Sequence, residues 1–160
     1  MPLKGGKWAY LCVWMDLFSR QIVGWQLGEN MQDSLVREPL ERALLRRRVK
    51  PGMIIHSDRG GQYLSNKMKE LVKTFKLKQN GPPRGMSRAD DPYDNAWAES
   101  FWSRLKAELA MPKGGYESLE KLKTVLFEYI DGYYNTRRLH SSLNYLNPVA
   151  FEAEYYRQTG

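Results

Sequence analysis

Apolar residues near the start of the chain fall into two short runs separated by a polar connection. The first run, Trp8–Asp16, is almost continuously apolar or aromatic, and the second run is Gln21–Leu27. Runs of this length and composition are typical of strands in the interior of a sheet. Because only the short segment Leu17–Arg20 joins them, we expect two antiparallel strands.

Apolar positions in the remainder of the chain recur mostly with helical spacing. This spacing predicts four helices, over residues 33–48, 65–75, 95–109 and 118–135. The side chains expected to cap three of them are Asp33 or Ser34, Asp94 and Ser118. Pro39 argues against regular helix in the first, because an interior proline removes a backbone hydrogen bond.

Two shorter segments between these helices, Met53–His56 and Leu77–Gln79, are predicted as strands. The loop Ser57–Gly61 follows the first of them, at a strand end where open α/β sheets tend to bind ligands. A second loop is expected at Gly81–Gly85, because its glycines and prolines disfavour regular structure. The alternation of strands and helices, without an internal repeat or linker, predicts one α/β domain spanning residues 1–160.

Charge and cysteine content narrow the functional classes. The chain has 160 residues, with 25 Lys and Arg against 18 Asp and Glu, and a formal charge of +7. This excess favours a polyanionic partner without proving one. Cys12 is the only cysteine, which excludes an intrachain disulfide and a cysteine-rich zinc site. No apolar run is long enough to span a bilayer, so we expect a cytoplasmic protein that does not enter the membrane.

Four phrases of the sequence occur in the order Met15–Trp25, His56–Tyr63, Met86–Arg88 with Tyr93–Phe101, and Tyr134–Tyr145 with Pro148. Together they resemble the catalytic core of bacterial insertion-sequence transposases in the integrase-core superfamily. The resemblance extends from about Trp8 to Phe151, nearly the whole chain. It implies a ribonuclease H-like fold, in which helices flank a mixed sheet with acidic residues at its centre.

The resemblance also implies a chemistry that requires carboxylates. DNA strand cleavage and joining are displacements at phosphorus, and two divalent metal ions can activate the attacking oxygen and stabilise the leaving one. Asp58 and Glu99 match the second and third acids of the family's three-acid set, which would hold two Mg²⁺ or Mn²⁺ ions. Without the resemblance, Asp58 reads as a turn residue beside glycines and Glu99 as a solvated helix residue.

The sequence departs from the family pattern in two respects. Between Asp58 and Glu99 lie 40 residues, about five more than the pattern, and Gly81–Gly85 can absorb the excess. The family's first acid lies on a strand before the one that begins here at Trp8, and we do not assign that role to Asp16. We therefore expect an N-terminally truncated catalytic core that lacks the first, central strand and lacks normal strand-transfer activity alone.

Candidate DNA contacts lie in two places. Lys106 is seven residues after Glu99 and so shares its helix face, where a cation would meet phosphate near the reacting bond. Arg137, Arg138 and His140 follow the last predicted helix and either bind the DNA backbone or interact favourably with the helix's C-terminus. Without the resemblance, an exposed lysine on an amphipathic helix is an equally good interpretation of Lys106.

The expected partners are double-stranded DNA, at the element ends and the target, and further copies of the chain on DNA. We find no helix-turn-helix or zinc module, so we expect contacts mainly to phosphate, no small-molecule cofactor, and association with the nucleoid when bound. The resulting hypothesis is a DNA transposition and integration domain. The alternatives are a non-catalytic DNA-binding or oligomerisation remnant of a transposase and, less favoured by the phrases, an unrelated nuclease with this fold.

Overall fold

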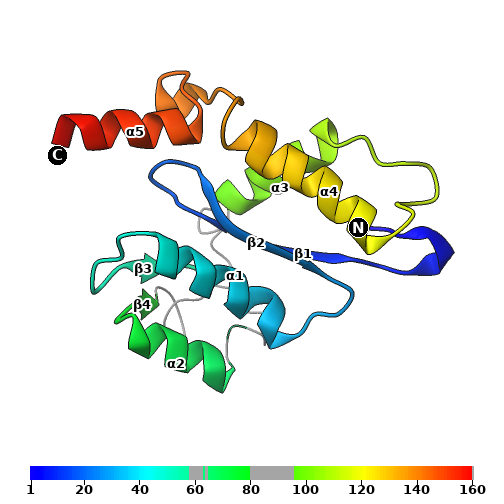
Figure 1. The fold of residues 1–160 in the computed structure, drawn as a ribbon, viewed down its shortest axis with the longest axis horizontal. Coiled ribbons are helices and arrows are strands. Elements are labelled where there is room, and N and C mark those ends of the chain that lie inside the picture. The colour runs from blue at the N-terminus through cyan, green and yellow to red at the C-terminus, as the bar shows by residue number, and fades with distance from the viewer. Residues whose placement is uncertain (58–62, 64, 80–95, 160) are drawn as a thin grey trace. The chain divides into compact units, whose positions relative to one another are not determined.

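The computed structural model describes residues 1–57, 63, 65–79 and 96–159, and they form a mixed α/β structure (Figure 1). The chain divides into two compact units. Unit 1 comprises Met1–Glu29 and Pro112–Gly160, and unit 2 comprises Asn30–Met111. Helices and strands occur in both units, which confirms the predicted fold class at the level of secondary structure.

Unit 1 is built on an antiparallel hairpin of β1 (Tyr10–Met15) and β2 (Ile22–Gly28). Its turn is closed by two backbone hydrogen bonds between Asp16 and the residues that follow, from Arg20 N to Asp16 O at 2.7 Å and from Asp16 N to Gln21 O at 2.9 Å. The predicted antiparallel pairing and its connection are therefore confirmed.

The N-terminal segment before β1 folds back onto unit 1. Leu3 is buried and forms a parallel bridge with Tyr116. Gly115 makes this approach possible, because it has φ +91° and a Cβ there would lie 2.7 Å from the Pro2 carbonyl oxygen. A larger residue at Gly115 would therefore push the N-terminal segment away.

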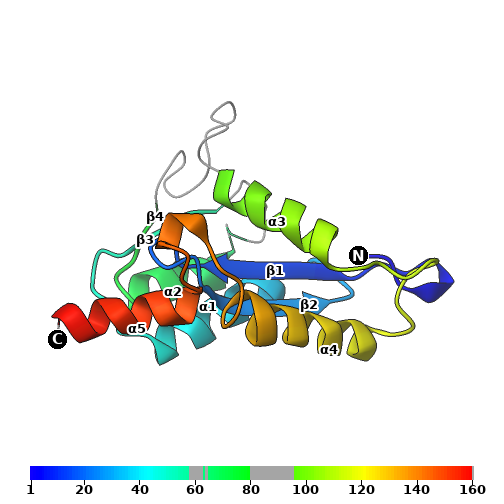
Figure 2. The same ribbon diagram turned by 90° about the horizontal axis from the view of Figure 1, so that it is seen from above.

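One long predicted helix is two helical segments in the structure. Helix α4 (Leu119–Tyr129) begins at Ser118, whose hydroxyl accepts a hydrogen bond from Lys121 N at 3.1 Å as predicted. It packs against β2 and continues as the π-helical turn η4 (Ile130–Tyr134) (Figure 2). The wider turn precedes Asn135, which is buried and holds Ile22 of β2 through its side-chain amide.

Unit 1 ends in a helix that the apolar pattern did not predict, α5 (Pro148–Thr159). Asn147 Oδ1 accepts a hydrogen bond from Ala150 N at 2.8 Å, and Pro148 occupies the first helical position, where its missing N–H costs nothing. The helix packs on the hairpin turn through the Phe18 ring, which lies 5.2 Å from Phe151 and 4.8 Å from Tyr155. Tertiary contacts, more than an apolar stripe, therefore hold α5 in place.

Unit 2 pairs α1 (Asp33–Arg46) with α2 (Asn66–Thr74). The predicted buried stripe of α1 is confirmed, and Pro39 is tolerated within the helix as part of its buried face. The predicted cap at Asp33 or Ser34 is wrong, because Gln32 is the N-cap and its side chain makes no capping bond. Asp33 instead lies in the first turn, where its carboxylate is directed to another helix.

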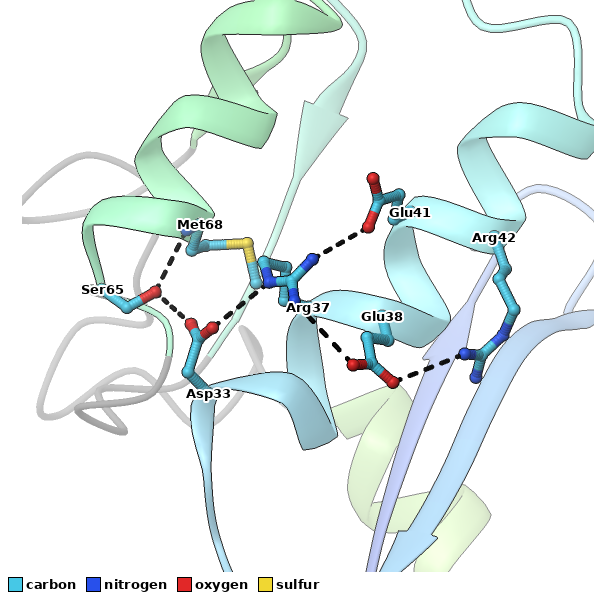
Figure 3. Close-up of polar contacts among 7 residues, drawn as sticks. All are labelled: Asp33, Arg37, Glu38, Glu41, Arg42, Ser65 and Met68. Atoms are coloured by element: carbon cyan, nitrogen blue, oxygen red, sulfur yellow. Dashed lines mark hydrogen bonds and ion pairs between the residues drawn. The ribbon is translucent and has the colours of Figure 1, made fainter.

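Two polar networks at the start of α1 and α2 meet at Asp33 (Figure 3). Ser65 caps α2 by accepting from Met68 N at 3.0 Å, and its hydroxyl donates to Asp33 Oδ1. Arg37 Nε donates to the other oxygen of Asp33 at 3.2 Å, and Arg37 Nη1 donates to Glu41 at 2.9 Å. The network fixes the start of α2, which directly follows the chain segment that contains Asp58.

The remaining elements of unit 2 are two short strands and a helix. Strands β3 (Ile54–Ile55) and β4 (Lys78–Gln79) pair in parallel, and α3 spans Ala96–Glu108. The described strands thus form one antiparallel and one parallel pair, so both orientations expected of a mixed sheet are present. The predicted loops Ser57–Gly61 and Gly81–Gly85 and the predicted cap Asp94 lie largely or wholly outside the described residues. A search of the described residues for a helix able to cross a membrane finds none.

Candidate phosphodiester and DNA-binding site

Helix α3 presents two of the predicted site residues on an exposed face. Phe101 and Leu105 are 1% and 2% exposed and anchor the opposite side of the helix. Glu99 lies in the first turn and Lys106 in the last, and both are exposed. Their spacing of about two helical turns places them on one side, as the sequence predicted. Neither side chain makes a hydrogen bond or ion pair with another described residue.

The position of Glu99 suits a metal-binding carboxylate. Glu99 lies in the first turn of α3, so a regular helix carries its carboxylate. Carboxylate oxygens are also the ligands that Mg²⁺ prefers. Glu99 therefore offers a charged hard ligand on a rigid element.

Asp58, the second predicted acid, lies outside the described residues. The structure describes what flanks it: β3 and the buried Ser57 come just before it, and Ser65 begins the next helix. Convergence of Asp58 with Glu99 stays a prediction. Within residues 1–57, 63, 65–79 and 96–159, no three or more His, Cys, Asp or Glu side chains gather in a way that could hold a metal ion.

Asp16 has a structural role in unit 1. Its Oδ1 accepts a hydrogen bond from Phe18 N at 2.8 Å, which stabilises the hairpin turn. Arg20 completes this turn with φ +62°, and burial lowers its pKa, an effect that nearby Tyr134 and Asp16 partly oppose. Asp16 is thus used by the fold through this hydrogen bond.

Arg137, Arg138 and His140 follow α4 and η4 in unit 1. Backbone hydrogen bonds hold this segment in a folded conformation. The carbonyl of Tyr133 accepts hydrogen bonds from both Arg137 N and Arg138 N at 2.8 Å. Backbone groups therefore satisfy this carbonyl, and the exposed guanidinium of Arg137 contacts no described side chain by hydrogen bond or ion pair. His140 is half-buried, with its ring edge-on to Tyr134 at 5.1 Å. Arg138 is half-buried as well.

The basic clusters of unit 2 differ in how they are neutralised. On α1, Arg37 pairs with Asp33 and Glu41, and Arg42 lies 3.8 Å from Glu38. On α2, the exposed Lys67, Lys69 and Lys73 have no ion pair with any described acid. The basic side chains Arg37 and Arg42 of α1 are thus partly neutralised by acids on the same helix, whereas the three α2 lysines have no ion pair with a described acid.

Sequence reasoning missed one residue of interest, Tyr145. It is 70% exposed and has φ +60°, a conformation that a bulky residue rarely adopts. The preceding Asn144, a residue type that tolerates this conformation, was the available signal.

Comparison with known proteins gives a consistent result. Residues 1–83 match a family model described as integrase core domain, and residues 85–148 match a second model with the same description. The chain is 42% identical over 152 residues to a transposase for insertion sequence element IS904 of Lactococcus lactis, covering 95% of this chain and 57% of that protein. It is 37% identical over 145 residues to the transposase InsF for insertion sequence IS3A of Escherichia coli, covering 91% and 48%.

The chain thus spans about half the length of the curated relatives it matches. Among solved structures, it resembles a chain of a simian T-cell lymphotropic virus intasome in complex with the PP2A regulatory subunit B56 gamma. The TM-score is 0.56 at 14% identity, covering 86% of this chain and 46% of the other. This likeness concerns the fold alone and agrees with the expected ribonuclease H-like architecture. The match to more than half of the chain, together with the identity to insertion-sequence transposases, shows that the chain belongs to the integrase core domain family.

Proposed function

We propose that residues 1–160 are an integrase-type catalytic core domain that acts in DNA transposition by metal-dependent strand cleavage and transfer. The observation that carries the proposal is the match of both chain segments to integrase core models, joined to 42% identity with a transposase. The exposed acid and cation on one face of α3 support it independently.

In this proposal Asp58 and Glu99 hold Mg²⁺ or Mn²⁺. Both are hard carboxylate ligands, and Glu99 is exposed and uncommitted among the described residues. When bound, two such ions supply the activation of the attacking oxygen and the stabilisation of the leaving oxygen. The family's first acid is not assigned to any residue of this sequence, so we expect weak strand transfer from this chain by itself.

The protein's own cations bind and orient the DNA. Lys106 would contact a phosphate beside the carboxylates, because it shares the exposed face of α3 with Glu99. Arg137, Arg138 and His140 would contact the DNA backbone from unit 1. Such contacts make binding depend strongly on salt and weakly on sequence. Assembly of several copies on DNA, and association with the nucleoid, belong to the same proposal.

A metal titration followed by thermal unfolding tests the site. A ligand that binds only the folded state stabilises it by RT ln(1 + [L]/Kd), so millimolar Mn²⁺ should raise the unfolding temperature of the unaltered chain. Asp58→Asn and Glu99→Gln should each remove the rise. Glu70→Gln, which neutralises an exposed acid on α2, is the matched control and should keep it.

The titration also distinguishes a catalytic domain from a non-catalytic remnant of a transposase. A catalytic domain predicts metal-dependent stabilisation through the two carboxylates. A non-catalytic DNA-binding or oligomerisation remnant predicts no stabilisation at millimolar metal and unchanged DNA binding in both acid variants. Stabilisation that survives in Glu99→Gln would contradict the assignment of that residue.

A further inference from the structure

The segment Thr136–Asn147 of unit 1 forms a loop whose ends meet. Val149 N donates to the carbonyl of Asn135 at 3.1 Å, which closes the loop where it joins α5. At its tip, Leu143 N and Tyr145 N donate to the His140 carbonyl at 3.0 and 2.9 Å. Leu143 is 2% exposed and anchors the loop. Compact loops of this kind, closed at their ends, are frequently functional.

The loop is fixed to the hairpin of unit 1 through Asn135. The side-chain amide of Asn135 accepts from Ile22 N at 2.9 Å and donates to Ile22 O at 3.0 Å. The same residue therefore terminates η4, holds the start of β2 and begins the loop. Side chains on the loop are presented from a rigid base, which reduces the entropy lost when they bind a ligand.

Tyr145 is the side chain this loop exposes most. Its ring makes no aromatic contact or hydrogen bond with any described residue, although 70% of the residue is exposed. Its φ of +60° is unfavourable for a residue with a Cβ, and the strain is held by the bonds around it. The exposed ring, on a backbone held in a strained conformation, is accessible to a ligand.

The charge of the loop points to the chemistry of its ligand. Thr136–Asn147 contains Arg137, Arg138 and His140 and no acidic residue. An exposed aromatic ring on a loop with basic side chains, of which Arg137 is exposed, is a combination that binds single-stranded nucleic acid, where the ring stacks on a base and a cation contacts phosphate. A base inside a duplex offers no free face, so stacking of this kind favours a ligand with an unpaired nucleotide.

We propose that Tyr145 stacks on an unpaired base of bound DNA and that Arg137 contacts a neighbouring phosphate. This inference rests on the proposed function, because it names how that domain holds a DNA end or a distorted site. It adds a binding residue to the contacts expected at Lys106, Arg138 and His140.

The test uses DNA binding in EDTA, so that it is independent of the metal site. Two probes share one duplex, one blunt and one with a single-stranded tail that carries 2-aminopurine, whose fluorescence is quenched by stacking. The unaltered chain should bind the tailed probe more tightly and quench it. Tyr145→Asn should weaken binding to the tailed probe by roughly five- to a hundredfold and lose the quenching. Tyr145→Phe should keep both properties.

Matched controls separate stacking from a structural role. Tyr156→Asn removes another exposed tyrosine of unit 1, 59% exposed on α5, and should keep the preference for the tail. Tyr145→Asn should unfold at the same or a higher temperature, because asparagine tolerates a positive φ. Arg137→Gln should reduce the salt slope of binding by about one unit on both probes.

The outcomes distinguish this inference from the function on which it rests. An unaltered chain that binds both probes equally, or a Tyr145→Asn variant that keeps the preference, would overturn the stacking role and leave the metal proposal intact. A lower unfolding temperature with equal losses on both probes would show that Tyr145 is structural. No binding to either probe would overturn both proposals.

Discussion

Asn135 in unit 1 and Asp33 in unit 2 both tie a helix to a second element, with opposite chemistry. Asn135 is neutral, 4% exposed, and bonds both backbone groups of Ile22. Asp33 is charged, its side chain is 26% exposed, and it bonds Ser65 and Arg37. Asn135 bonds the backbone of a strand in a buried site. Asp33 instead joins side chains that water and salt can reach.

The difference between these two contacts indicates which parts of the fold are held rigidly and which are held weakly. A buried bond is costly to break because the partner left behind stays unsatisfied. A partly exposed ionic contact is worth less, because water replaces it and salt screens it. Unit 1 thus has a rigid base for the loop that carries Tyr145, and unit 2 has a softer attachment for the start of α2.

The largest effect should follow from Asn135→Leu. This change leaves the N–H and carbonyl of Ile22 unpaired and should lower the free energy of unfolding by about 3 kcal/mol. Denaturant unfolding measures it, and the loss should be the same at low and high salt. Gln158→Leu, an exposed amide on α5, is the control and should stay within about 0.5 kcal/mol. A loss at Asn135 no larger than the control's would break the comparison.

Asp33→Ala should have a smaller and salt-dependent effect. It removes the acceptor for Ser65 and Arg37 and should cost about 1–2 kcal/mol at low ionic strength, decreasing in 1 M NaCl as the ionic part is screened. Asp33→Asn can keep the bond to Ser65 while removing the charge, and so should recover part of the loss. A cost that does not change with salt would mean that the contact behaves like the one at Asn135.

Tyr116→Phe tests the opposite case, a buried polar group that has no hydrogen-bond partner among the described residues. The Tyr116 hydroxyl is buried without a hydrogen-bond partner among the described residues, so removing it should raise stability by about 1 kcal/mol. Burial raises the pKa of Tyr116 above the ordinary value of 10.0. The neutral form is thus favoured in the folded state, and its contribution is complete below pH 10 and lost as pH rises toward the folded pKa. The advantage of Tyr116→Phe in unfolding experiments should therefore grow above pH 10.

Glu154→Gln should have the smallest effect. The hydrogen bond from Arg157 is the main cause that lowers the pKa of Glu154, followed by the bond from Gln158. Any stabilisation would be present above the ordinary carboxyl pKa and lost as pH falls through the lowered one. Because Arg157 is exposed and Glu154 is partly exposed, solvent screening should leave the unfolding temperature unchanged at pH 7 and at pH 3. A measurable shift in the unfolding temperature would show that exposed ion pairs stabilise this fold more than the comparison of Asn135 with Asp33 implies.

Local signals predicted much of the fold. The apolar run before Asp16 and the short connection after it predicted the hairpin, and Ser118 predicted the start of α4. The missed helix α5 lacks a clear apolar stripe, although Asn147-Pro148 marks its start. The error at the cap of α1 arose because Asp33 bonds a residue of another helix instead of its own backbone.

The candidate site was predictable to a similar extent. Helical spacing placed Glu99 and Lys106 on one face of α3, and the structure agrees. The role of Tyr145 was hidden, because an exposed tyrosine and a core tyrosine look the same in a sequence.

By itself, the sequence determined the order of strands and helices, the basic charge and the family, because periodicity, capping residues and motifs are properties of neighbouring positions. Only the tertiary structure decided that Asn135 holds Ile22, that Asp33 holds Ser65 and that Tyr145 is left outside. These contacts join residues distant in the chain or depend on the backbone conformation at one position. Neither property is encoded in local spacing, since folding of the whole unit selects which polar groups are buried and which rings stay exposed.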